Sequence, residues 1–255
     1  SIPLALVPLV MVGTWITHLF GGSAGREGVA VQIGATLSHA FGKKLKMPDN
    51  SKVMLITGMA AGFGGLFQTP LTAVFFAIEV IVAGYMDYEA ILPAMIGAFV
   101  ASFTSHTLGL EKFEVNLNQT INMTDVNNVI VIIVLGVSFG IAGRLFSVLL
   151  HKAKVFMSKK IENPYMRIGV ISIPLAICLL FIFSGRYTGL GTNLISEALG
   201  GNEVYYYDWI LKLLFTIATL AIGFQGGEVT PLFSIGATLG VVLGSLLGIY
   251  TIVCG

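Results

Sequence analysis

Long apolar segments alternate along the chain with short polar or glycine-rich turns. This pattern predicts helices over residues 2–20, 28–41, 53–67, 69–84, 90–110, 129–156, 168–183, 192–199, 209–223 and 231–247. The longer segments can cross a bilayer, which takes about 20 apolar residues, whereas several others are too short to cross it alone. Short apolar helices of this kind are typical of transporters with broken or re-entrant helices. The pattern therefore predicts an all-α, polytopic membrane protein.

One stretch of sequence occurs twice. The residues IGATL occupy positions 33–37 and again 235–239, an offset of 202 (235 − 33). The same offset aligns two pairs of glycines, Gly21 with Gly223 and Gly25 with Gly227. Paired half-helices in inverted repeats are a recurrent transporter architecture. We therefore expect one incomplete membrane domain made of a first-repeat part, residues 1–128, and a second-repeat part, residues 129–255.

A helix that starts within a membrane has a specific chemical use. Its first backbone N–H groups have no acceptor inside the helix, and the positive end of the helix dipole adds to their attraction for an anion. Glycines just before each helix start let the backbone approach an ion closely. The two repeated stretches, 21–37 and 223–239, therefore favour an anion over a cation as the substrate.

Glu27 is the carboxylate that this arrangement singles out. A carboxylate at membrane depth is costly and is by default functional. At the positive end of a half-helix, Glu27 can occupy the place of an anion and leave on protonation, so that it acts as a gate that also carries a proton. The alternative interpretation is an ion pair with Arg26 at the lipid headgroups. We expect Glu79 to have a structural role and Glu228 to cap or brace its turn.

Composition narrows the class of protein. The chain is 55% hydrophobic and 11% charged, with a mean hydropathy of +0.88, which is typical of multi-span membrane proteins. A net charge of +1 without a basic patch excludes nucleic acid as a partner. The four histidines show no metal-ligand spacing, so we expect no metal site, and Cys178 and Cys254 are expected to be buried apolar residues. No nucleophile–base pair or cofactor loop appears, so we expect neither an enzyme nor a bound cofactor.

Cationic residues predict the orientation in the membrane. They concentrate in two clusters, Lys43, Lys44 and Lys46, and Lys152, Lys154, Lys159, Lys160 and Arg167. The positive-inside rule places both clusters in the cytoplasm and the polar loop after Glu111 outside. Because the chain opens and closes within or beside apolar runs, we expect it to be a piece of a longer multi-pass protein of the inner (plasma) membrane.

The sequences GREGVAVQIGA at 25–35 and GGEVTPLFSIGATLG at 226–240 resemble the CLC family of anion channels and proton-coupled antiporters. The family motifs read GREGP and GGxFxP, and TPLTAVFFAIE at 69–79 also matches. The resemblance implies that Glu27 is the gating glutamate. It also implies that anions bind the backbone N–H groups of six residues: Arg26, Gly28, Val29, Glu228, Val229 and Thr230. It further implies a homodimer with two pores, in which the helices at 69–84 and 90–110 contribute to the dimer interface.

Departures from the family motifs change the expected substrate. Val29 replaces a proline, Val229 replaces a phenylalanine, and Val80 stands where many chloride/proton exchangers have a second glutamate. This combination is similar to the fluoride-exporting bacterial branch of the family. Fluoride is strongly hydrated and needs strong donors, which the Thr230 hydroxyl could supplement. The family's early pore motif and late pore tyrosine fall outside this chain.

The resulting hypothesis is a proton-coupled fluoride exporter, in which fluoride and protons exchange across the bilayer. The first alternative is a chloride channel or chloride/proton exchanger of the same family. An alternative of another class is a non-conducting membrane sensor or structural protein.

Overall fold

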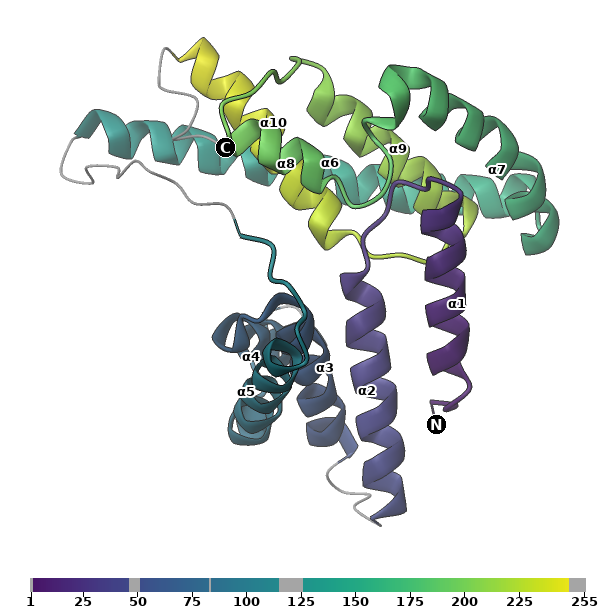
Figure 1. The fold of residues 1–255 in the computed structure, drawn as a ribbon, viewed down its shortest axis with the longest axis vertical. Helices are drawn as coiled ribbons and strands as arrows, with labels where there is room; N and C mark the ends of the chain where they lie inside the picture. Colours follow the sequence, from purple (N-terminus) through teal and green to yellow (C-terminus); the bar gives the residue numbers. More distant parts are fainter. Residues whose placement is uncertain (1, 46–50, 83, 115–125, 248–255) are drawn as a thin grey trace. The chain divides into compact units, whose positions relative to one another are not determined.

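A computed structural model of the chain describes residues 2–45, 51–82, 84–114 and 126–247. In these ranges regular structure is helical (Figure 1), with α1 (Leu6–Leu19), α2 (Glu27–Lys44), α3 (Ser51–Phe67), α4 (Pro70–Glu79), η2 (Tyr88–Ala90), α5 (Ile91–Thr107), α6 (Val126–Lys160), α7 (Pro164–Phe181), η3 (Ile182–Gly185), α8 (Thr192–Leu199), α9 (Asp208–Ile222) and α10 (Val229–Leu246). The expected all-α class is confirmed. Lys46 and Cys254 lie outside the described residues.

The chain forms two compact units, Ser1–Gly13 with Arg26–Glu114, and Thr14–Gly25 with Val115–Gly255. In the first unit, α3 packs against α2, α4 and α5. Small residues make this packing close, because a side chain added at Gly34 of α2 would overlap the backbone of Gly58 in α3. The core of this unit combines alanines of α4 and α5 with larger apolar residues of α3 such as Ile56 and Phe63.

In the second unit, α9 packs against α6, α7 and α10, and α10 also packs against α8. Its largest cluster joins Phe146 and Leu150 of α6 to apolar residues of α9. The segment Thr14–Gly25 is held in this unit by polar contacts: the Thr17 hydroxyl donates to the carbonyl of Gln225 at 2.7 Å. This segment leads directly into the start of α2.

The two repeats have the same helix boundaries. Adding 202 to the bounds of α2, Glu27–Lys44, gives those of α10, Val229–Leu246, residue for residue. The same offset moves the start of α1 from Leu6 to Asp208, where α9 begins. Thr36 donates its hydroxyl to the carbonyl four residues earlier, and Thr238 does the same. The repeat seen in five residues of sequence therefore covers two successive helices.

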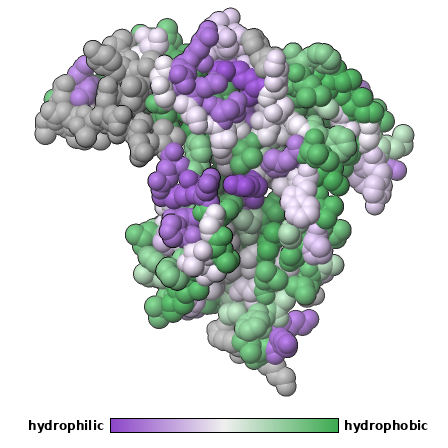
Figure 2. All heavy atoms as spheres, in the orientation of Figure 1, coloured by the Kyte–Doolittle hydropathy of each residue, from purple (hydrophilic) through white to green (hydrophobic). Residues whose placement is uncertain are grey.

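Apolar side chains cover much of the surface. In the described residues, four helical segments are long and apolar enough to cross a membrane, Tyr88–Thr107, Val126–Lys160, Pro164–Phe181 and Val229–Leu246. Figure 2 shows hydrophobic residues over α7 on the visible face. Cys178 lies on α7 and is exposed, so its expected burial was wrong. The physical reason is that α7 is apolar all round and buries little of its surface within the protein.

Candidate functional site

The start of α2 holds the buried carboxylate. Arg26 occupies the N-cap position with φ −118° and ψ −4°, and its side chain makes no capping hydrogen bond. Glu27 is the first residue of the helix and is 1% exposed, while Arg26 beside it is exposed. This difference argues against the interpretation of an Arg26–Glu27 pair at lipid headgroups, because such a pair would leave both groups in polar surroundings. Glu27 and Val29, which is also buried, therefore lie inside the protein at a helix N-terminus.

The start of α10 repeats this geometry. Glu228 occupies the N-cap position with φ −110° and ψ −13°, and its side chain is exposed and makes no capping hydrogen bond. Of the two roles expected for Glu228, capping its turn was therefore wrong, because the exposed side chain makes no hydrogen bond to the helix start. The backbone N–H groups of this first turn have no acceptor within the helix. Thr230, 6% exposed, contributes a hydroxyl beside them.

A backbone pairing connects the two segments that lead into these helices. Within the second unit, Gly25 and Gly227 each donate their N–H to the other's carbonyl at 2.7 Å, which forms an isolated antiparallel bridge. The two glycines are separated by 202 residues, which is the repeat offset, and each lies two positions before its helix. Gly226 also lies close to this segment, since a side chain there would contact Ala24. Glycines at these positions therefore permit two backbones to meet.

The two repeats differ at the position of the carboxylate. The offset of 202 places Val229 opposite Glu27, Thr230 opposite Gly28 and Pro231 opposite Val29. At the aligned positions, the start of α2 therefore has a titratable group, Glu27, and the start of α10 has a hydroxyl, Thr230.

Sequence reasoning missed Lys212, a completely buried cation in α9. Its Nζ donates to the carbonyl oxygens of Tyr187 at 3.1 Å and Gly189 at 2.8 Å. A side chain on Gly191 would lie 2.7 Å from Lys212 Cε and 2.5 Å from the hydroxyl of Ser234, a residue of α10. The lysine therefore brings positive charge to the N-terminal half of α10. The sequence feature that could have identified this buried cation is a single lysine inside the apolar stretch 209–223.

A second buried polar cluster adjoins the start of α9. Asp208 is completely buried and accepts hydrogen bonds from Arg186, from the Tyr187 hydroxyl at 2.5 Å and from the Tyr205 N–H at 2.9 Å. Burial and the bond to Asp208 raise the pKa of the Tyr187 hydroxyl above its usual range. Tyr187 therefore stays protonated as a donor, and its carbonyl accepts from Lys212, so the cluster positions the lysine.

Other candidate groups lie apart from these helix starts. Glu79 ends α4 and is exposed, as is Val80 after it. His18 contacts the carbonyl of Thr14, one turn earlier in its own helix. Among the described residues, no group of three or more His, Cys, Asp or Glu side chains could hold a metal ion.

Comparison with known proteins adds independent findings. Residues 1–253 match the family model described as "Voltage gated chloride channel". A "Chloride/fluoride channel protein" of Pseudomonas syringae pv. tomato is 37% identical, and the match covers 96% of this chain and 56% of that protein. The "H(+)/Cl(-) exchange transporter ClcA" of Klebsiella pneumoniae is 26% identical over 94% of this chain and 52% of its own length.

Two solved structures have the same fold. A CLC-type fluoride/proton antiporter is 49% identical with a TM-score of 0.94, and the match covers 98% of this chain and 63% of that one. A slow cyanobacterial Cl⁻/H⁺ antiporter is 21% identical with a TM-score of 0.79, over 94% of this chain and 57% of the other. The chain thus spans a little over half the length of these relatives. The match of the family model over nearly the whole chain, together with the shared fold, shows that this chain belongs to the voltage gated chloride channel (CLC) family of polytopic membrane proteins.

Proposed function

We propose that the protein containing this chain is a proton-coupled fluoride exporter, which exchanges fluoride for protons. The observation that carries this proposal is Glu27, a carboxylate 1% exposed at the N-terminus of α2. Protonation neutralises this group, so an anion can then take its place at the helix N-terminus, while deprotonation returns the charge to that place. The likeness to a fluoride/proton antiporter at 49% identity supports the choice of anion.

The proposed anion ligands are the backbone N–H groups of Arg26, Gly28, Val29, Glu228, Val229 and Thr230. They belong to the first turns of α2 and α10 or to the N-cap residues before them. The absence of side-chain caps on both helices supports this assignment, since N–H groups at a helix start need acceptors from elsewhere. Val80, which is exposed after Glu79, cannot carry a proton. It therefore supports a proton route that differs from the route in exchangers with a second glutamate at this position.

Fluoride efflux from liposomes that contain the full-length protein tests the proposal. We expect fluoride efflux to drive proton uptake, and we expect chloride to move more slowly. In Glu27→Gln the fluoride-driven proton flux should fall to the background of empty liposomes, because the amide cannot exchange a proton. Glu79→Gln is the matched control and should retain coupling, since that carboxylate is exposed at a helix end.

Each possible result tests a different part of the proposal. Equal or faster chloride transport would favour the alternative of a chloride/proton exchanger, which the likeness to the exchange transporter ClcA supports. Proton flux that persists in Glu27→Gln would remove Glu27 from the mechanism. Intact protein without any anion flux would favour a non-conducting sensor or structural protein.

The proposal extends to assembly and location. We place the protein in the inner (plasma) membrane as a homodimer. Exposed apolar residues on α4 and α5, such as Phe75, Leu92 and Phe103, support an interface on these helices. Cross-linking of full-length protein with single cysteines on this face would report the dimer, and failure to cross-link at every such position would contradict it. We propose neither a catalysed reaction nor a cofactor.

A further inference from the structure

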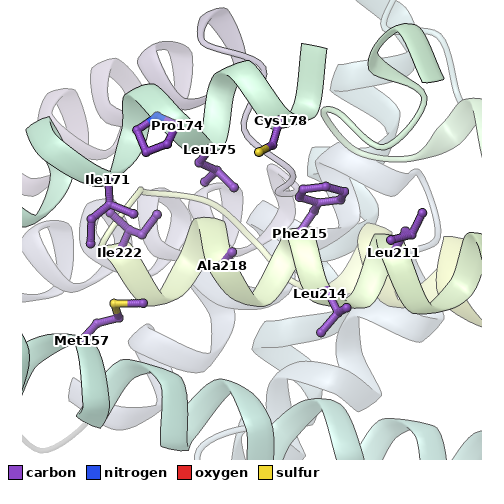
Figure 3. Close-up of a pocket in the computed structure, with 10 residues that line it drawn as sticks. All are labelled: Met157, Ile171, Pro174, Leu175, Cys178, Leu211, Leu214, Phe215, Ala218 and Ile222. Carbon is purple, nitrogen blue, oxygen red and sulfur yellow. The ribbon is translucent and has the colours of Figure 1, made fainter. Parts of the chain in front are cut away.

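An apolar groove of about 370 Å³ lies in the second unit among α6, α7 and α9 (Figure 3). Met157, Ile171 and Ile222 lie toward one end of the groove, and Cys178 and Leu211 lie toward the other. The side chains that line it are apolar apart from the thiol of Cys178. The groove does not involve Glu27 or the start of α10, so it is separate from the proposed transport site.

Cations gather at the Met157 end of the groove. Arg167 lies one turn before Ile171 on α7, and its Nε donates to the carbonyl of Ile222 at 2.9 Å. Lys154 and Lys160 stand three residues on either side of Met157 in α6, and the Lys160 ammonium lies 5.8 Å from the ring centre of Phe156, the residue beside Met157. Both lysines are exposed. Glu162 lies in the turn between α6 and α7. Its single negative charge does not cancel the positive charges of Lys154, Lys160 and Arg167, so the net charge of these four residues is positive.

The dimensions match one leaflet of a bilayer. Along α7, the rise from Arg167 to Cys178 is about 16 Å at 1.5 Å per residue. Half of the hydrocarbon core of a bilayer is about 15 Å thick. A headgroup at Arg167 would therefore place the end of an acyl chain near Cys178. An apolar protein segment could also fill such a groove, but it would not account for three cations at one end.

We propose that this groove binds an anionic phospholipid, with one acyl chain along α7 and its phosphate held by Arg167, Lys154 and Lys160. The guanidinium is the best placed of the three groups, because its Nε is fixed by Ile222 while its Nη groups remain as donors to a phosphate. Lys154 and Lys160 contribute further positive charge at the level of the headgroup, as point charges on flexible side chains.

The test places a reporter in the groove. In full-length protein with every other tryptophan replaced by phenylalanine, Leu214→Trp provides one fluorophore among the lining residues. The protein is reconstituted in phosphatidylcholine vesicles with increasing fractions of phosphatidylglycerol or phosphatidylcholine that carries brominated acyl chains. We expect brominated phosphatidylglycerol to quench the reporter at a lower mole fraction than brominated phosphatidylcholine does. The two mole fractions should differ by about fivefold for each cation that contacts the headgroup.

Variants of the cations and a second reporter make the result specific. Arg167→Gln with Lys154→Gln and Lys160→Gln should abolish the preference, whereas Arg167→Lys should retain part of it because the charge remains. The pair Lys154→Gln and Lys160→Gln alone changes only exposed residues and should lower the preference without affecting folding. Val148→Trp, outside the groove and nine residues before Met157 on α6, should be quenched equally by both lipids.

Three outcomes would overturn the proposal. Equal quenching of Leu214→Trp by both brominated lipids would mean that bulk bilayer solvates the groove without selection. Protection of Leu214→Trp from both lipids would mean that protein, from the same chain or from a second copy, covers the groove. A preference that survives loss of all three cations would assign the selectivity to other residues.

Discussion

At the scale of single residues, Lys212 combines complete burial with a positive charge. Two carbonyl oxygens, of Tyr187 and Gly189, accept hydrogen bonds from its Nζ. Its neighbour across Gly191 is Ser234, five residues after the start of α10. Five residues of helix correspond to about 7.5 Å. The lysine therefore adds its field to that of the helix N-terminus.

We expect Lys212→Met to weaken fluoride binding in the full-length protein. Two charges about 10 Å apart interact by about 1.7 kcal/mol at an effective dielectric of 20, which corresponds to a factor of roughly 10 to 20. The fluoride concentration for half-maximal flux should rise by that factor. Lys212→Arg is the control and should stay close to wild type. An unchanged half-maximal concentration in a folded Lys212→Met protein would show that the lysine has only a structural role.

Gly34 is a residue at which even one methyl group has no space. A side chain there would overlap the carbonyl of Gly58 in α3, a backbone atom that cannot rotate away. We expect Gly34→Ala to lower stability by about 1–3 kcal/mol or more, the usual cost of overpacking. Thermal unfolding in detergent would measure this. Gly136→Ala on α6, where nothing lies within 4 Å, should be neutral or slightly stabilising, because alanine is the better helix former.

At the scale of elements, the sequence predicted which helices exist better than where they end. The helix expected at 192–199 has the observed bounds, Thr192–Leu199. The segment expected at 129–156 extends over Val126–Lys160, since hydrogen bonds within a helix continue where apolar residues stop. Conversely, 69–84 shortens to Pro70–Glu79, and the chain turns before Gly84, whose φ is +77°. Hydropathy marks the apolar part of a helix, whereas turns and caps set its ends.

The sequence likewise predicted only part of the candidate site. Glu27, the glycines before it and the repeat at 223–239 were visible in sequence, because local chemistry and spacing mark them. The pairing of Gly25 with Gly227 and the surroundings of Lys212 were not visible, because they join residues distant in the chain. The Asp208 cluster was also missed, since it connects the turn at Arg186 with the start of α9.

Asp208 provides a test of that cluster as the anchor of α9. Asp208→Asn removes one of the two carboxylates that pair with Arg186 and leaves Glu197, at 2.6 Å, as the other. We expect a loss of about 1–3 kcal/mol in unfolding free energy, because the donors that Asp208 accepts from lose a charged, buried acceptor. Denaturation monitored by circular dichroism would measure it. The exposed Glu111→Gln serves as the control, and a similar small effect in both variants would contradict an anchoring role.

At the scale of the whole molecule, charge predicts which ends of the helices face the cytoplasm. The helix α6 has 35 residues, or about 52 Å at 1.5 Å per residue, so it exceeds a hydrocarbon core of about 30 Å. Its lysine-rich end therefore extends into the headgroup region and water. The end of α2 likewise carries Lys43 and Lys44 in its last turn.

We expect both lysine-rich ends to lie in the cytoplasm and the loop after α5 to lie outside, because cationic loops are retained on the cytoplasmic side. Single cysteines at Lys44, Glu111 and Lys159, with Cys178 and the other cysteines replaced by alanine, would test this in intact cells. A membrane-impermeant maleimide should label Glu111→Cys at once. It should label Lys44→Cys and Lys159→Cys only after permeabilisation, and labelling of these two from opposite sides would show that charge alone does not set the orientation.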